Sequence, residues 1–192
     1  MTRALLIIDV QNDYFPGGAL PLPGMAEAAD NCRRLLQQFR TARAPVVHVQ
    51  HHASADLGAL VTLTTGAEIH ASVRPTAGEA VIAKTSPNAF RGTWLHPLLA
   101  GVGISELVIC GAMTQTCIDS TTRAAFDLGH AVTVAADACA ARDLRLSGVK
   151  LPAAQVQAVI LAALQTPFAQ LSSTAELIAA SALRPDTPEA AA

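Results

Sequence analysis

The stretch that decides the fold is residues 108–129, VICGAMTQTCIDSTTRAAFDLG. It opens with the end of an apolar run that is typical of a buried strand, breaks at Gly111, and continues with the pattern of a helix. Thr114 is the predicted N-cap of that helix, which places Cys117 at its third position. Because the free backbone N–H groups of a first turn favour negative charge, we expect the Cys117 thiolate to form more readily than that of a free cysteine.

Cys117 also has a simpler interpretation, since a cysteine often serves as a small buried hydrophobe. The chain has four cysteines, at positions 32, 110, 117 and 139, and they form no C-x-x-C pair. Their irregular spacing favours reduced thiols over disulfides or a zinc site, so we expect a cytoplasmic protein.

Composition favours one well-packed α/β domain. The chain has 192 residues, of which 51% are hydrophobic and 15% are charged, and its formal net charge is −2. We find no basic stripe and no apolar run long enough to span a bilayer, and we expect no signal peptide. We therefore expect neither nucleic acid nor a membrane as a partner. The domain is predicted over residues 1–184, followed by a frayed tail over residues 185–192.

Short apolar runs alternate with longer helical segments along the chain. Strands are predicted at residues 4–8, 46–50, 81–83, 107–110, 131–135 and 168–171. Helices are predicted at residues 25–43, 94–100, 114–129, 152–165 and 174–183, the last of them capped by Thr174. This alternation predicts an α/β fold with three α/β/α layers, in which a six-stranded parallel sheet lies between two layers of helices.

Three reactive side chains come just after three of these strands: Asp9, Lys84 and Cys117. Parallel sheets bind ligands beyond the carboxyl ends of their strands, so we expect the three to lie together. Individually, Asp9 could be a turn carboxylate and Lys84 an exposed lysine. However, the chain has 11 arginines and only two lysines, which favours a specific role for Lys84. Together the residues predict a carboxylate base, an electrostatic partner and a thiol nucleophile.

Three motifs carry a resemblance that covers nearly the whole chain. The first is LIIDVQND at residues 6–13, followed by GGAL at residues 17–20. The second joins Lys84 to NAF at residues 88–90 and GT at residues 92–93, and the third joins CGAMT at residues 110–114 to Cys117 and TTRA at residues 121–124. With these motifs the sequence resembles the isochorismatase-like cysteine hydrolases, which include nicotinamidases and N-carbamoylsarcosine amidases.

The resemblance implies a parallel sheet in the order 3-2-1-4-5-6 and a catalytic triad of Asp9, Lys84 and Cys117. It also implies a cis peptide bond between Ala112 and Met113, and an oxyanion hole made by the backbone N–H groups of Met113 and Cys117. The implied reaction is hydrolysis of a C–N amide-type bond of a small molecule through a cysteine thioester, without a cofactor, in a homo-oligomer such as a dimer or tetramer. Relatives that hydrolyse isochorismate carry glycine in place of the nucleophile, so Cys117 argues against that reaction.

No metal site is predicted, although nicotinamidase-like relatives hold a metal with an Asp-x-His arrangement after the second strand. This chain has HHASAD from His51 onward, and adjacent histidines point in different directions. His51 and His52 remain candidates to bind a metal together with His70 or Asp56. The segment around them, residues 51–78, has no clear pattern and is expected to be a functional loop or a surface excursion.

A substrate pocket is predicted from aromatic and polar residues close to the three reactive ones in the sequence. The predicted substrate-binding residues are Gln11, Phe15, Phe90, Trp94 and Met113. Trp94 could instead pack between helices, and Gln11 could orient the site or cap a loop. Two rival functions stay open, a thiol redox or sensing protein that uses Cys117 and a catalytically idle binding protein of the same fold.

Overall fold

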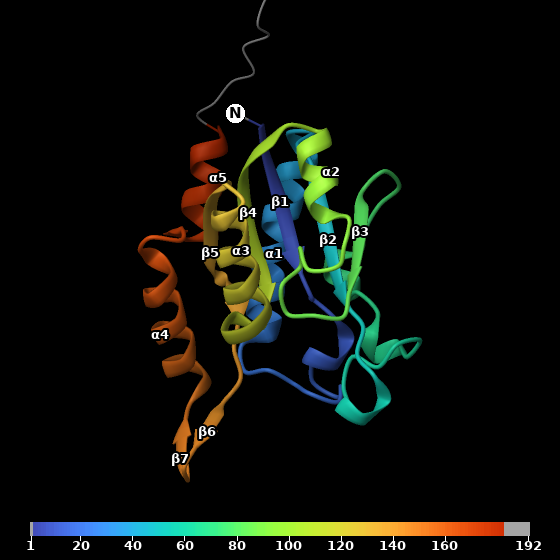
Figure 1. Ribbon diagram of the computed structural model, residues 1–192, viewed down its shortest axis with the longest axis vertical. Coiled ribbons are helices and arrows are strands. Elements are labelled where there is room, and N and C mark those ends of the chain that lie inside the picture. The colour runs from blue at the N-terminus through green and yellow to red at the C-terminus, as the bar shows by residue number, and fades with distance from the viewer. Residues whose placement is uncertain (1, 183–192) are drawn as a thin grey trace, which may run out of the picture.

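The computed structural model describes residues 2–182, which form one large sheet covered by helices (Figure 1). The strands of this sheet are β1 (Thr2–Ile8), β2 (Val46–His51), β3 (Ala80–Lys84), β4 (Ile104–Ala112), β5 (Ala131–Ala140) and β8 (Gln170–Ser172). All neighbouring pairs are parallel, in the order β3-β2-β1-β4-β5-β8. The predicted order is confirmed, because β8 is the sixth strand of this sheet. The predicted tail at 185–192 and the end of the last predicted helix lie outside the described residues.

Helices cover both faces of the sheet, which confirms the three predicted layers (Figure 1). One face carries α1 (Met25–Thr41) and α5 (Thr174–Ala182), and the other carries α2 (Leu95–Gly101), α3 (Asp119–Asp127) and α4 (Ala153–Gln165). In β1, Leu5 and Ile7 face α1, whereas Leu6 and Ile8 face the other layer. A strand that is apolar on both faces needs a helical layer on each. Among the described helices, none is long and apolar enough to cross a membrane.

The predicted helix at 114–129 is in fact two elements, and Thr114 does not cap it. Thr114–Ile118 form a wider π-helical turn, and α3 begins only after that turn. The hydroxyl group of Thr114 is buried and donates a hydrogen bond of 2.5 Å to Gln157 in α4. A tertiary contact therefore uses the side chain that the sequence pattern assigns to the helix terminus.

The predicted cap of the last helix, Thr174, is also wrong by one residue. The backbone N–H and hydroxyl groups of Thr174 both donate to Asp137 Oδ1, at 2.8 and 2.9 Å, and tie α5 to β5. Ser173 makes the cap instead: its hydroxyl accepts from the N–H of Glu176, and its own N–H donates to Glu176 Oε2. This reciprocal pair is a capping box.

A short antiparallel hairpin between β5 and α4 was not predicted. It consists of β6 (Leu144–Leu146) and β7 (Val149–Leu151) and extends away from the main sheet (Figure 1). Its two turn residues, Ser147 and Gly148, both have positive φ angles, 49° and 83°, as a tight hairpin turn requires. Strands of three residues are too short to give a readable alternation of apolar and polar positions.

Residues 51–78, for which the sequence predicted only an irregular segment, contain three short 3₁₀ turns at Ala55–Leu57, Thr65–Ala67 and Ala71–Val73. Asp13, just after β1, fixes this segment. Asp13 Oδ2 accepts a hydrogen bond of 2.6 Å from the N–H of Leu60, and Asp13 Oδ1 accepts one of 3.0 Å from the N–H of Ala19. The segment is therefore tied to the loop after β1, at the carboxyl end of the sheet.

Candidate active site

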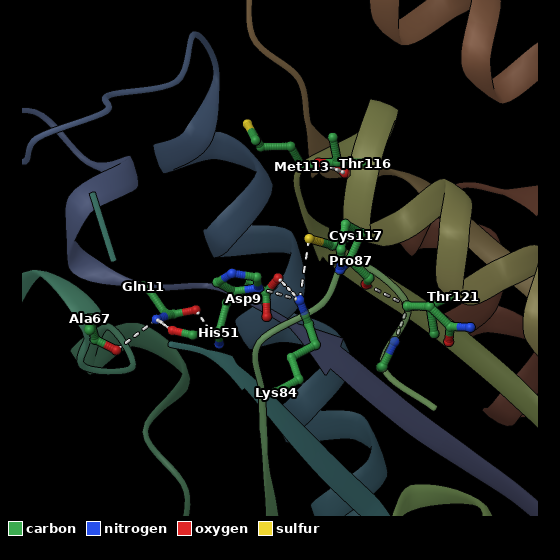
Figure 2. Close-up of polar contacts among 12 residues, drawn as sticks. Asp9, Gln11, His51, Ala67, Lys84, Pro87, Met113, Thr116, Cys117 and Thr121 are labelled. Carbon is green, nitrogen blue, oxygen red and sulfur yellow. Dashed lines mark hydrogen bonds and ion pairs between the residues drawn. The ribbon is translucent and has the colours of Figure 1, made fainter. Parts of the chain in front are cut away.

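Asp9, Lys84 and Cys117 meet at the carboxyl edge of the sheet (Figure 2). Asp9 follows β1, Lys84 ends β3, and Cys117 lies in the π-helical turn after β4. Lys84 Nζ is 2.7 Å from Asp9 Oδ2 and donates to Cys117 Sγ over 3.3 Å. The side chains of Asp9 and Lys84 are both 0% exposed, and Cys117 is 5% exposed. The site is thus a buried ion pair in direct contact with a thiol.

Gly111 allows the end of β4 to approach the end of β1 closely. Gly111 lies opposite Ile8 in the β1–β4 pair and has a φ angle of 120°. A Cβ atom at this position would overlap the backbone of Ile8, so no other residue fits without moving one of the strands. This close approach sets the turn that carries Cys117 beside Asp9, which itself has a φ angle of 51°.

The backbone around Cys117 is closed by local hydrogen bonds. The peptide bond between Ala112 and Met113 is cis. The Met113 carbonyl then accepts hydrogen bonds from the N–H groups of Thr116 and Ile118, at 3.1 and 3.2 Å. This turn fixes where the Cys117 side chain begins, directly above the sheet edge.

Thr121 links the helix after Cys117 to the loop after Lys84. Its hydroxyl oxygen accepts a hydrogen bond of 3.0 Å from the N–H of Ala89, and its hydroxyl donates to the carbonyl of Pro87 at 3.4 Å (Figure 2). Thr121 is fully buried, so these bonds are shielded from water. The two segments that supply the lysine and the thiol are therefore held together.

The prediction that the Cys117 thiolate forms readily is wrong. Burial and the Asp9 carboxylate raise the pKa of the Cys117 thiol to about 12, although the Lys84 ammonium acts in the opposite direction. The sequence argument weighed only the free N–H groups of a helical turn. Loss of water around the sulfur outweighs that contribution, because a thiolate in an apolar environment has lost its hydration.

His51 completes the contacts of the Lys84 ammonium. Its Nδ1 atom lies 2.9 Å from Lys84 Nζ, and the two residues are direct neighbours in the β2–β3 pair (Figure 2). The sequence presents His51 only as a metal candidate. That His51 ends the strand paired with β3 could have indicated its role, but only if the strand register were known.

A metal could be held by three donors in this site, Asp9, His51 and Cys117, whose ligand atoms all lie within 4.8 Å of one another. Lys84 Nζ lies within 3.3 Å of all three side chains, so the cation at this place is the protein's own. Within residues 2–182, the other metal candidates do not join this group. His70 Nδ1, for example, is hydrogen-bonded to Ser72.

Gln11 and Phe15 are bound to the segment that follows β2. The Gln11 amide is fully buried and donates to the carbonyl groups of His51 and Ala67, at 2.8 and 2.7 Å, while it accepts from the N–H of His51. The Phe15 ring stacks on His70 with centroids 3.7 Å apart, and both line a cavity of about 380 Å³. Gln11 therefore holds backbone, and Phe15 forms a wall.

The remaining predicted pocket residues lie in different places. Met113 directly precedes the turn with Cys117 and is 9% exposed. The Phe90 ring faces His130, which comes just before β5 and so lies at the opposite, amino edge of the sheet. Trp94 precedes α2 and is 51% exposed. Met113 therefore lies beside the turn that holds Cys117, and the roles of Met113, Phe90 and Trp94 in substrate binding stay predictions.

The order of the sheet and the three side chains at its edge define an isochorismatase-family hydrolase. The chain belongs to this family, because the isochorismatase domain model matches residues 3–176.

Three known proteins show how close the likeness is. The isochorismatase family protein YddQ of Bacillus subtilis strain 168 is 43% identical over 175 residues, which cover 91% of this chain and 97% of YddQ. A streptothricin hydrolase of Streptomyces noursei is 40% identical over 143 residues, or 74% of this chain and 51% of that protein. The crystal structure of an isochorismatase hydrolase from Oleispira antarctica superposes with a TM-score of 0.90 at 47% identity, covering 93% of this chain and 96% of that one.

Proposed function

We propose that this protein hydrolyses a C–N amide-type bond of a small molecule, with Cys117 as the nucleophile. The observation that carries the proposal is the buried Lys84 ammonium in contact with both Asp9 and Cys117. A carboxylate, a cation and a thiol at these distances are the parts that nucleophilic catalysis needs. The streptothricin hydrolase likeness supports hydrolysis of a small molecule.

In the first half of the reaction, Asp9 takes the proton of the Cys117 thiol as the sulfur attacks the substrate carbonyl carbon. The new C–S bond gives a tetrahedral intermediate with a negative oxygen. Asp9 then returns the proton to the amide nitrogen, the C–N bond breaks, and ammonia or an amine leaves. The product of this half is a thioester on Cys117.

In the second half, Asp9 takes a proton from a water molecule, whose oxygen attacks the thioester carbonyl. The C–S bond breaks, the Cys117 sulfur regains a proton, and a carboxylic acid leaves. Throughout, Lys84 keeps a positive charge beside both groups that become negative. Such an ammonium lowers the cost of forming a thiolate in a buried site.

The proposed oxyanion hole consists of the backbone N–H groups of Met113, which precedes the π-helical turn, and Cys117, which lies within it. One such donor contributes roughly 3–4 kcal/mol of transition-state stabilisation in comparable sites. Met113 and Phe15 are the proposed substrate contacts. For Gln11 we propose a positioning role, because its side-chain amide is already hydrogen-bonded to the backbone of His51 and Ala67.

We also propose that the protein is a homo-oligomer in the cytoplasm. Leu146 and Val149 on the hairpin are 71% and 60% exposed, which supports association with a second copy in a dimer or tetramer. All four cysteines are free, which supports the reducing environment of the cytoplasm.

The test is ammonia release from a panel of primary amides, with Cys117→Ala as the inactive variant and Cys32→Ala as the matched control. Cys32 is buried in the opposite layer of the core, so its replacement should leave turnover intact. Mass spectrometry of the wild type should show an acyl adduct on Cys117. Full activity of Cys117→Ala, with the fold shown intact by circular dichroism, would end the proposal.

A further inference from the structure

The Lys84 ammonium has as many acceptors as it has N–H donors. Its Nζ atom lies 2.7 Å from Asp9 Oδ2, 2.9 Å from His51 Nδ1 and 3.3 Å from Cys117 Sγ. An ammonium group offers three donors and no acceptor. Figure 2 shows the three partners arranged around the nitrogen atom, each from a different segment of the chain. Removing any one of them leaves a buried N–H group without its partner.

His51 can act as an acceptor only when it is neutral, with its proton on Nε2. Burial and then the Lys84 ammonium lower the pKa of His51, whereas Asp9 raises it and His52 lowers it further. These groups and the Cys117 sulfur are the titratable neighbours that face the ring among the described residues. Burial and the cation therefore favour the neutral form, which suits the acceptor role.

The side chain of His51 contacts Lys84, whereas the side chain of its neighbour His52 does not. Both backbone groups of His51 are bound by the side chain of Gln11, at 2.8 Å each. His51 is also paired directly with Lys84 across β2 and β3. His52 Nδ1, in contrast, is buried and has no hydrogen-bond partner among residues 2–182. Two adjacent histidines thus differ in the one contact that matters here.

We propose that His51 is a positioning residue for the thiol chemistry, because it directs the Lys84 ammonium toward Asp9 and Cys117. This inference rests on the proposed function, in which Cys117 is the nucleophile. Without the imidazole, one buried N–H of Lys84 loses its acceptor, and the ammonium is less favoured beside the sulfur. The consequence is a thiol that loses its proton less easily, although His51 never touches the substrate.

The experiment measures alkylation of Cys117 by iodoacetamide at pH 8, followed by mass spectrometry of the intact protein and its peptides. This readout needs no substrate. His51→Leu removes the acceptor, whereas His51→Asn keeps an acceptor oxygen close to the position of Nδ1. His52→Leu is the matched control one residue away. Circular dichroism shows whether each variant is folded.

We expect His51→Leu to be alkylated at Cys117 about ten times more slowly than the wild type, which corresponds to about one pKa unit. His51→Asn and His52→Leu should react within about threefold of the wild type. The first variant keeps an acceptor for the charge-assisted hydrogen bond from Lys84, and the second removes no contact of Lys84. If His51→Leu does not fold, the comparison of His51→Asn with His51→Ala takes its place.

Wild-type rates in His51→Leu would overturn the inference, and so would a failure of His51→Asn to restore the rate. An equal loss in His52→Leu would also overturn it, because a general disturbance of the strand end would then be the cause. The proposed function fails separately, when wild-type protein releases no ammonia from any amide while these alkylation rates still differ as expected.

Discussion

Replacing Lys84 by methionine tests the central contact of the site, because methionine keeps the apolar stem and removes the charge. Asp9 is 0% exposed, and among residues 2–182 its carboxylate oxygens have no hydrogen-bond partner apart from this ion pair. Removing one partner of a buried pair leaves the other charge uncompensated and costs roughly 3–5 kcal/mol. We therefore expect Lys84→Met to lose about that much of its free energy of unfolding.

Urea unfolding at pH 7, followed by circular dichroism, measures this loss. The double variant Asp9→Asn, Lys84→Met is the key comparison, since it removes both charges together and should recover most of the lost stability. Both variants should be inactive. Two results would refute this reasoning: a free energy of unfolding for Lys84→Met within about 1 kcal/mol of the wild-type value, or a double variant that is less stable than Lys84→Met.

Three further outcomes follow from other contacts. Gly111→Ala should lower the free energy of unfolding by about 3 kcal/mol or more, because its Cβ would overlap the backbone of β1. Gly101→Ala is the control: its Cβ would meet open space, so the free energy of unfolding should change by less than about 1 kcal/mol. Thermal melting of the two variants measures the difference. Burial raises the pKa of Glu79, but hydrogen bonds, the largest of them from a guanidinium group, lower this pKa to about 2. The Glu79 carboxylate therefore stabilises the fold above pH 4.5, and this contribution is lost as the pH falls toward 2. Glu79→Gln should therefore show a smaller loss of stability across that range in acid titrations, and an unchanged loss would contradict this. In Lys84→Ala the carboxylate, imidazole and thiol of the site have no resident cation, so this variant should bind one Co²⁺ with a thiolate-to-metal absorption band that the wild type lacks.

Much of the fold follows from the sequence because the strands of a parallel sheet are apolar on both faces. Continuous apolar runs such as residues 4–8 are easy to recognise in the sequence, and the alternation of these strands with helices predicts the layered architecture. The ends of elements do not follow in the same way. β4 is longer than the predicted strand at 107–110, because hydrogen bonds with two neighbours extend it past positions that are locally ambiguous.

The candidate site could be predicted where chemistry coincides with topology. Asp9 and Lys84 come at the ends of recognisable strands, so the rule for parallel sheets brings them together. His51 was missed as a partner of Lys84, because its contact depends on strand register and on Gln11, which binds it from a distant loop. Phe90 was placed in the pocket because it is close to Lys84 in sequence, and its role stays a prediction, since the ring contact that the structure gives it is with His130.

The raised pKa of Cys117 bears on the choice between hydrolase and redox sensor. Because burial and the Asp9 carboxylate raise the pKa of the Cys117 thiol above its usual range, the resting thiolate is disfavoured at pH 7. A sensor cysteine needs the opposite, an accessible sulfur with a low pKa. The carboxylate that disfavours the resting thiolate is also a base within 4.8 Å of the sulfur, so a proton transfer to Asp9 can accompany attack on a bound carbonyl. Under the proposed function, Cys117 would therefore lose its proton when a substrate carbonyl is bound and stay an inert thiol otherwise.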